Sequence, residues 1–246
     1  MTLFELLTQG TECLERAESP DAGNDAKLLL LEAFGLDMTH FLLNRMQKMP
    51  EDQRVSECVE KYREWIARRA KRVPLQQILG SQEFMGMEFF VNEHVLIPRQ
   101  DTETLVELER ECRNERQNEQ PDEHECENHG KIQRNIQHKK RVLDLCAGSG
   151  CIGISLAVLG GFEYVAEADL SEEALKVTRK NVERLVQGAG TSVECFHGDL
   201  FSAIPDGAEP FDILVSNPPY IPTKVIEGLE PEVRDHEPMM ALDGTE

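Results

Sequence analysis

The sequence predicts an α/β protein in which a mostly parallel, Rossmann-like sheet follows a helical bundle and a β-hairpin. From residue 141 onward, apolar strand-like runs alternate with helical segments, which is typical of a parallel sheet covered on both faces. Before that point, apolar residues recur at helical spacing. We therefore divide the 246 residues into a helical domain (1–73), a hairpin linker (74–100) and a sheet domain (101–246).

The helical domain contains three stretches of helical periodicity, over residues 3–14, 26–34 and 55–66. Pro74 ends this pattern, because the residue before a proline is disfavoured in a helix. Alternating side chains over 82–91 then predict a hairpin. A short extended piece is expected over 95–97, before Pro98.

Residues 109–140 are a polar stretch of mixed charge with no sizeable hydrophobic face. Its start is expected to extend a helix from Thr102, and the rest to be a solvated surface insertion. Four side chains near or in this stretch are potential metal ligands: Cys112, His124, Cys126 and His129. Their spacing matches no usual zinc site, so we expect no metal.

The sheet domain is expected to run strand, helix, strand, helix, strand, strand. The strands cover 141–145, 164–170, 192–197 and 211–215, and the helices cover 151–159 and 172–186. Ligands of such sheets bind where the strands end, so the residues that follow each strand are the candidates for a site.

Composition narrows the class of partner. A formal net charge of −20 disfavours a bare phosphate backbone, since nucleic-acid affinity rests on clustered lysine and arginine. Seven cysteines, an odd number, and the lack of an apolar signal segment predict reduced thiols in a cytoplasmic protein. No apolar run is long enough to cross a bilayer, so no membrane partner is expected, and we expect a monomer.

A glycine-rich turn follows the first strand of the sheet. Residues 148–153 match the G-x-G-x-x-G pattern, where missing side chains let a ligand approach the backbone. Asp169 closes the next strand about 20 residues after Gly148, where a carboxylate accepts both ribose hydroxyls. Together with Gly150, these residues predict a cofactor that carries adenosine, and leave open a nicotinamide dinucleotide or S-adenosyl-L-methionine.

Two further aspartates favour S-adenosyl-L-methionine. Asp144 precedes the glycines, where its charge would repel a pyrophosphate but suits the ammonium and sulfonium groups of that cofactor. Asp199 ends the third strand, where it can accept a hydrogen bond from the adenine amino group. Leu200 beside it offers an apolar wall.

The residues Ser216-Asn217-Pro218-Pro219-Tyr220 follow the last expected strand. The side-chain oxygen of Asn217 and the carbonyl of Pro218 are two acceptors for the N–H groups of a planar amide or amine. Pro218 and Pro219 stiffen this presentation, and the Tyr220 ring can pack on a flat target group. The element predicts methylation of such a nitrogen, with Asn217, Pro218 and Tyr220 as catalytic residues.

At this point the chain resembles the HemK/PrmC protein-(glutamine) methyltransferases, which modify peptide chain release factors. The similar segments are 25–30, 74–80, 83–84, 95–103, 143–150, 216–221, 229–238 and 241–244. The segment 229–238 is not a general methyltransferase feature, so it separates this family from nucleic-acid enzymes with the same Asn-Pro-Pro-Tyr element.

The resemblance implies a helical substrate-recognition domain, a hairpin linker and a class I S-adenosylmethionine-dependent domain. The implied substrate is the glutamine of the Gly-Gly-Gln loop of a release factor, and the implied cofactor is S-adenosyl-L-methionine. By position, Asp169 would bind ribose and Asn217 would contact both cofactor and substrate. The remaining implied positions are Gly148 and Gly150 at the methionine side, Asp199 and Leu200 at adenine, and Pro218, Pro219 and Tyr220 at the glutamine amide.

Three departures from the family pattern stand out. Cys146 occupies a position where many relatives have glycine, and residues 109–140 are longer and more polar than the usual connection. The third is that the family continues after 241–244 with a helix and three strands. On the usual strand order the strand 211–215 would be central, so here it is expected to become an apolar edge. We therefore expect an incomplete catalytic domain, truncated after the fourth strand, with reduced activity.

Two other functions stay open on the sequence. An adenine-amino methyltransferase acting on DNA or RNA meets the same geometric problem, because its target is also an exocyclic planar nitrogen. An inactive module that docks a release factor without turnover would explain a shortened sheet. Binding to nucleic acid at physiological salt separates the first from the enzyme proposed above, and binding of S-adenosyl-L-methionine separates the second.

Overall fold

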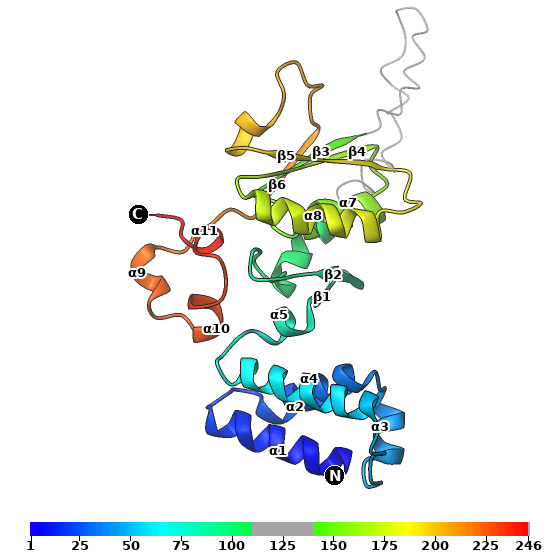
Figure 1. Cartoon of the computed structure of the whole chain (residues 1–246). Helices are drawn as coiled ribbons and strands as arrows, with labels where there is room; N and C mark the ends of the chain where they lie inside the picture. Colours follow the sequence, from blue (N-terminus) through cyan, green and yellow to red (C-terminus); the bar gives the residue numbers. More distant parts are fainter. Residues whose placement is uncertain (110–139, 246) are drawn as a thin grey trace, which may run out of the picture.

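The computed structural model describes residues 1–109 and 140–245, which form a helical bundle, a hairpin and a four-stranded sheet (Figure 1). The bundle consists of α1 (Leu3–Arg16), α2 (Ala22–Phe34), α3 (Met38–Asn44) and α4 (Gln53–Arg69). The candidate metal ligands Cys112, His124, Cys126 and His129 lie outside the described residues, as does nearly all of the polar insertion. Across the described part, no group of three potential metal ligands is found.

The bundle forms because its helices are capped and each buries one apolar face. Thr2 and Glu5 make a reciprocal capping box at the start of α1. α2 ends at Gly35, which adopts the left-handed conformation with φ of 61°. Leu6, Leu14, Leu29 and Leu30 pack in a core with Tyr62 of α4. The helical periodicity expected over the first part of the chain is confirmed.

The helical pattern of the bundle ends before Pro74, as expected, because α4 finishes at Arg69. The sequence analysis did not predict the further short helix that follows, α5 (Leu75–Leu79); Pro74 lies at its N-cap, where a proline costs no hydrogen bond. Gly80 then closes α5 with φ of 75°. The expected hairpin follows as β1 (Ser81–Phe84) and β2 (Met87–Phe90), paired antiparallel. Residues 95–97, expected to be extended, form no strand.

The sheet consists of β3 (Arg141–Leu145), β4 (Tyr164–Asp169), β5 (Ser192–His197) and β6 (Ile213–Ser216). All pairs are parallel, and the order is β5-β4-β3-β6. α7 (Cys151–Leu159) and α8 (Glu172–Leu185) connect successive strands as expected. β6 begins at Ile213 instead of residue 211. The preceding Asp212 donates its N–H to the Arg141 carbonyl and accepts the Arg141 N–H through its carboxylate.

The two faces of the sheet are covered differently. α7 and α8 pack on one face together with the hairpin residues Phe84 and Phe89. On the other face, the cover among the described residues is the 3-10 helix η2 (Leu200–Ala203) and the segment up to Phe211, not an α-helix. β6 lies at one edge of the described sheet, and its Leu214 side chain is 53% exposed.

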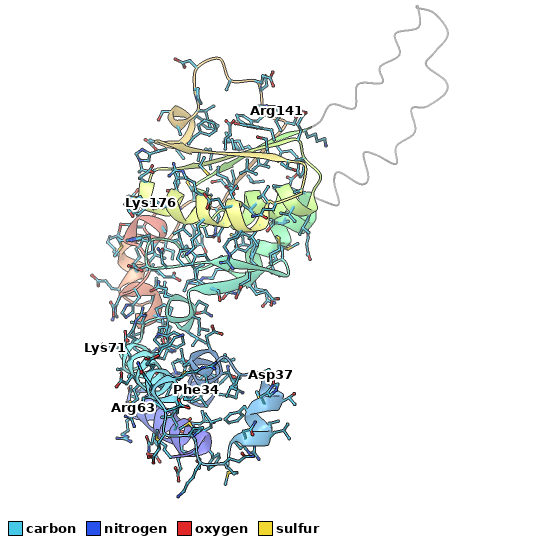
Figure 2. All side chains as sticks on the ribbon, turned by 45° about the vertical axis from the view of Figure 1, so that its right-hand side comes forward. Phe34, Asp37, Arg63, Lys71, Arg141 and Lys176 are labelled. Carbon is cyan, nitrogen blue, oxygen red and sulfur yellow. The ribbon has the colours of Figure 1, made fainter. Side chains whose placement is uncertain are left out.

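Short helices complete the described chain. The 3-10 helix η1 (Gln100–Thr102) leads into helical residues 103–109, and three single-turn helices follow β6. These are α9 (Thr223–Ile226), α10 (Pro231–Arg234) and α11 (Met239–Leu242). In Figures 1 and 2 this last segment lies beside α5, between the bundle and the sheet. Among the helices of the described residues, none has the length and apolar character needed to span a bilayer.

Candidate functional site

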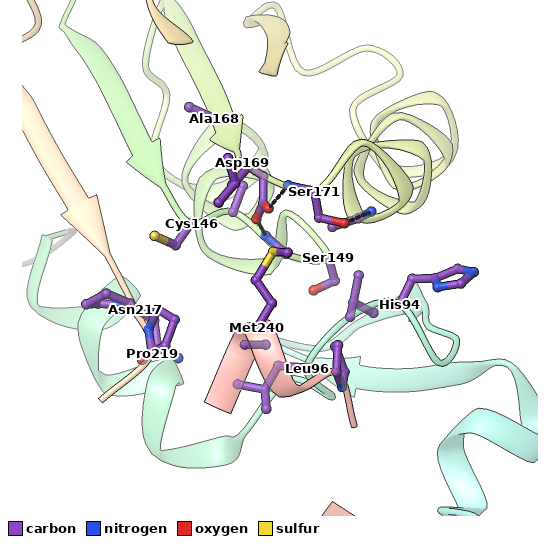
Figure 3. A pocket seen from close by; sticks show the side chains of 18 of the residues that line it. His94, Leu96, Cys146, Ser149, Ala168, Asp169, Ser171, Asn217, Pro219 and Met240 are labelled. Carbon is purple, nitrogen blue, oxygen red and sulfur yellow. Dashed lines mark hydrogen bonds between the residues drawn. The ribbon is translucent and has the colours of Figure 1, made fainter. Parts of the chain in front are cut away.

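A cavity of about 510 Å³ opens at the carboxyl ends of the parallel strands, within the usual size range of small-molecule sites. The turn after β3, the end of β4, the start of η2 and the residues after β6 all line it. The segment after the hairpin and the segment around α11 form the opposite wall. Figure 3 shows Asn217 and Pro219 at one side of this cavity and His94 at the other.

The glycine turn between β3 and α7 places its glycines in different surroundings. Gly148 lines the cavity with φ of 57°, and a Cβ atom added there would meet no atom within 4 Å. A Cβ on Gly150, at φ of 76°, would lie 2.7 Å from Thr178 and 2.8 Å from Ile154. Gly148 therefore leaves room for a ligand. Gly150 is required for the packing of α7 and does not line the cavity.

Asp169 is held at the mouth of this turn. One carboxylate oxygen accepts the Gly148 N–H at 2.8 Å, and the other accepts the Ser171 N–H at 2.8 Å (Figure 3). Ser171 in turn caps α8 by accepting the Ala174 N–H. Because each carboxylate oxygen accepts more than one hydrogen bond, Asp169 keeps free lone pairs for hydroxyl groups in the cavity.

Asp144 lies below the turn and does not line the cavity formed by the described residues. Its side chain is fully buried on β3, and one oxygen accepts the Gly153 N–H at 2.9 Å. Its register partner on β4 is Glu167, which is also fully buried. Burial raises the pKa of Asp144 to about 7 and raises that of Glu167 well above its ordinary value. This placement supports the turn and does not favour direct contact of Asp144 with a cofactor.

Asp199 and Leu200 follow β5 and line the far end of the cavity. Asp199 is exposed, and its backbone carbonyl accepts bonds from Ser202 at the start of η2. Leu200 has a positive φ of 48° and a half-exposed side chain. An acceptor carboxylate and an apolar side chain therefore lie next to each other, as a flat heterocycle with an amino group requires.

The Asn-Pro-Pro-Tyr element follows β6, where the Ser216 hydroxyl donates to the Leu145 carbonyl at 2.8 Å. Asn217, Pro218 and Pro219 line the cavity, and Asn217 is half-buried. Tyr220 is 75% exposed and does not line the cavity that the described residues form. The expected packing of its ring on a target group therefore has no counterpart within the cavity itself.

Cys146 lies in the same cavity, between the glycine turn and Asn217 in the view of Figure 3. Its φ is 60°, in the left-handed region that favours glycine. Burial raises the pKa of its thiol, so the side chain is a neutral, small group at the cavity wall. The structure thus explains why glycine suits this position, and why a small side chain leaves the turn open.

Some lining residues were not expected as site residues. Arg99 and Thr102 belong to segment 95–103, one of the segments that carry the family resemblance. Met240, Ala241 and Pro238 come from a segment that the sequence marked only as typical of the family. Figure 3 shows Met240 extending from α11 toward the glycine turn and Asp169. Neither periodicity nor a ligand motif marks these residues, because only the folded chain brings them to the strand ends.

The parallel sheet, the glycine turn and the Asn-Pro-Pro-Tyr element at the strand ends define a class I S-adenosylmethionine-dependent methyltransferase domain. Two family models match the chain. The "PrmC N-terminal domain" matches residues 5–80, and the "Methyltransferase small domain" matches residues 131–228.

Curated relatives identify the family. A "Release factor glutamine methyltransferase" of Geobacter sulfurreducens is 40% identical over 220 residues, which are 89% of this chain and 66% of that protein. The protein of the same name from Bacillus cereus is 32% identical over 249 residues, covering all of this chain and 77% of that protein. The chain belongs to the release factor glutamine methyltransferase family.

The chain thus spans about two thirds to three quarters of the length of these relatives. Among solved structures, the hMettl16 catalytic domain bound to a MAT2A 3'UTR hairpin is 15% identical, with a TM-score of 0.45. That match covers 74% of this chain and 57% of the other. This likeness is too weak to bear on function.

Proposed function

We propose that this chain methylates the side-chain amide nitrogen of the glutamine in the Gly-Gly-Gln loop of a peptide chain release factor, with S-adenosyl-L-methionine as methyl donor. The observation that carries the proposal is that one cavity is lined both by Asn217 with Pro218 and by Gly148 with Asp169. Amide acceptors and a nucleoside-type site therefore face a common space. Family membership supports the choice of substrate.

The residues present fit the proposed cofactor. Gly148 leaves open space at its missing side chain, and Asp169 is already fixed by two backbone N–H groups. Asp199 and Leu200 offer an acceptor beside an apolar surface for adenine. Asp169 and Asp199 also give the cavity a negative character that suits a cationic donor. When bound, S-adenosyl-L-methionine supplies a methyl group on a positively charged sulfur.

The catalytic work we propose for the chain is positioning. The Asn217 side-chain oxygen and the Pro218 carbonyl accept the two N–H groups of the substrate amide and aim its lone pair into the cavity. Pro218 and Pro219 limit backbone motion, so this geometry is set before the substrate arrives. Aligning two bound reactants can lower the activation free energy of the reaction by about 7–11 kcal/mol. No side chain has to remove a proton before the new N–C bond forms. The sulfur would keep the electron pair of the C–S bond that breaks, and the methylated nitrogen would then release one N–H proton to solvent.

Tyr220 takes a different place in the proposal from the one expected. Because its ring is exposed outside the cavity, it is suited to contact the backbone or neighbours of the substrate loop that enters from solvent. Asp144 with Gly150 supports the glycine turn from below.

We also propose a role for each part of the chain. Residues 1–73 recognise the release factor, residues 74–100 link the helical bundle to the sheet domain, and residues 101–246 form the catalytic part. The acidic charge supports a monomer that makes no direct contact with nucleic acid.

The test uses purified chain, labelled S-adenosyl-L-methionine, and a release factor beside its variant with alanine for the loop glutamine. If label appears in the unchanged release factor and not in the alanine variant, the proposal is supported. Label in both, or in neither, contradicts it. A gel-shift assay at physiological salt tests the alternative function. Binding of DNA or RNA in that assay would favour an adenine-amino methyltransferase. Cofactor binding without transfer would favour an inactive docking module.

A further inference from the structure

Residues 229–245, which we call the strap, connect the helical bundle to the cavity. At its first half, Glu232 accepts hydrogen bonds from Arg72 Nε at 2.7 Å, Arg72 Nη2 at 2.6 Å and Arg69 Nη1 at 2.9 Å. Arg69 is the last residue of α4, and Arg72 lies in the turn that follows the helix. The Gln77 side chain donates to the His236 carbonyl at 2.9 Å. The strap is thereby bonded to α4, α5 and the turn between them.

The Glu232 contact is shielded from water. The side chains of Arg69, Arg72 and Glu232 are 7%, 19% and 16% exposed. Arg69 is itself fixed by Asp25 of α2 at 2.6 Å, so the cluster is anchored in the bundle core. Burial alone would raise the pKa of Glu232, but the bonds from Arg72 and Arg69 outweigh it and lower the pKa. Charge-assisted bonds of this kind hold geometry better than exposed ion pairs do.

The strap then turns onto the cavity. Glu237, whose side chain is 1% exposed, accepts two bonds from Arg99 Nη2 at 2.9 Å. Arg99 lines the same wall of the cavity as the strap. From there the strap supplies six residues of the cavity wall: Pro238, Met240, Ala241, Asp243, Gly244 and Thr245.

The second half of the strap also lies directly on the Asn-Pro-Pro-Tyr element. Ile221 donates its N–H to the Leu242 carbonyl at 3.1 Å and accepts the Gly244 N–H at 3.0 Å. A Cβ atom on Gly244 would lie 2.7 Å from the Tyr220 Cα, so the two backbones are in close contact. The strap therefore touches the bundle at one end and the amide-binding element at the other.

We propose that Glu232, through Arg69 and Arg72, is a positioning residue that holds the strap against the cavity, so that the helical bundle sets the shape of the cofactor and amide site. Glu232 does not line the cavity and acts only through the strap. The assignment of the cavity to S-adenosyl-L-methionine rests on the proposed function. The ordering of the strap by Glu232 does not.

Hydrogen exchange of the full chain tests the strap directly. Glu232→Gln keeps the size of the side chain but removes its charge and sets an amide group against Arg72. We expect the amides of Ala241, Asp243 and Gly244 to exchange about tenfold faster, which is the effect of losing one charge-assisted bond. Amides in β3 and β4 should keep their rates. Unchanged strap rates, or acceleration confined to residues 231–237, would overturn the proposal, as would equal acceleration in the sheet.

The matched control is Asp235→Asn. Asp235 is on the same strap and pairs with Arg234, but both side chains are exposed, so this variant should change neither readout. Arg72→Gln attacks the contact from the bundle side and leaves Arg69 bonded to Asp25. If Arg72 and Glu232 act as one unit, the strap amides of the double variant exchange no faster than those of Glu232→Gln alone. Independent, additive effects would contradict the proposed unit.

Calorimetric titration with S-adenosyl-L-methionine gives the functional readout. Glu232→Gln should raise the Kd about tenfold, with Asp235→Asn at the wild-type value. An unchanged Kd for Glu232→Gln overturns the claim that the bundle shapes the cofactor site. If the wild-type chain does not bind this cofactor, the proposed function fails. The exchange experiment still decides whether Glu232 orders the strap, because it needs neither cofactor nor substrate.

Discussion

The buried pair of Asp144 and Glu167 predicts an unusual dependence of stability on pH. The two carboxyl groups are register partners on β3 and β4, and both side chains are fully buried. Apart from each other's carboxyl group, Asp144 Oδ1 and both Glu167 oxygens have no hydrogen-bond partner among the described residues. Two such groups cannot both be ionised without a large cost, so the folded pair retains a proton near neutral pH.

The magnitude follows from proton linkage. The folded-state pKa values are raised, to about 7 for Asp144, whereas the unfolded chain ionises both groups at 3.8 and 4.5. Groups with raised pKa values contribute stability below their unfolded pKa, and that stability is lost as pH rises through the folded pKa. Each extra proton that the folded pair holds makes the unfolding free energy fall by about 1.4 kcal/mol per pH unit, so one retained proton gives a loss of about 3 kcal/mol from pH 5 to 7. That loss lowers Tm by about 6–12 °C for a chain of this size.

Glu167→Gln removes one acid and provides an amide N–H for Asp144, so it should flatten this dependence. The measurement is the Tm of variant and wild type at several pH values between 5 and 8, taken as a difference so that other groups cancel. We expect the difference, variant minus wild type, to rise with pH. Glu88→Gln, an exposed strand residue paired with Arg184, is the control and should give a constant difference. A constant difference for Glu167→Gln as well would refute the buried shared proton.

The other predictions concern the cavity. Asn217→Ala should lower kcat about 100-fold in the release-factor assay while the Kd for S-adenosyl-L-methionine stays near wild type, since misplacing the amide affects the reaction more than the cofactor; equal loss of both contradicts the role of Asn217. Gly148→Ala should weaken cofactor binding, measured by titration, at a cost of only about 1–2 kcal/mol in stability. Gly150→Ala should instead destabilise the fold by about 2–5 kcal/mol, measured by urea unfolding, because its methyl group meets Thr178 and Ile154; the reverse order of the two glycine variants would be inconsistent with their surroundings. Cys146→Gly should raise unfolding free energy by up to about 1 kcal/mol by removing a left-handed non-glycine residue, and a lower Tm would count against that reading.

The sequence could predict which residues at the strand ends line the cavity, because this depends on their position directly after or at the end of a strand. Asp169 is the last residue of β4, and Gly148, Asp199 and Asn217 come within a few residues after the ends of β3, β5 and β6. A parallel sheet brings all such positions to one edge. Asp144 shows where this reasoning fails. Its position in the chain is right for the site, but whether a side chain on a strand end points into a cavity or into the sheet depends on packing, and Asp144 is fully buried.

Sequence alone determined the order of the elements, the parallel sheet and the family, because periodicity, glycine turns and contiguous motifs are properties of neighbouring residues. The pairing of Asp144 with Glu167, and the bonds from Glu232 to arginines about 160 residues earlier, became apparent only in the folded chain. Such contacts depend on which surfaces meet when the bundle, the hairpin and the sheet pack together. No local pattern of residues encodes that meeting, so the strap and its charges became visible only in the folded chain.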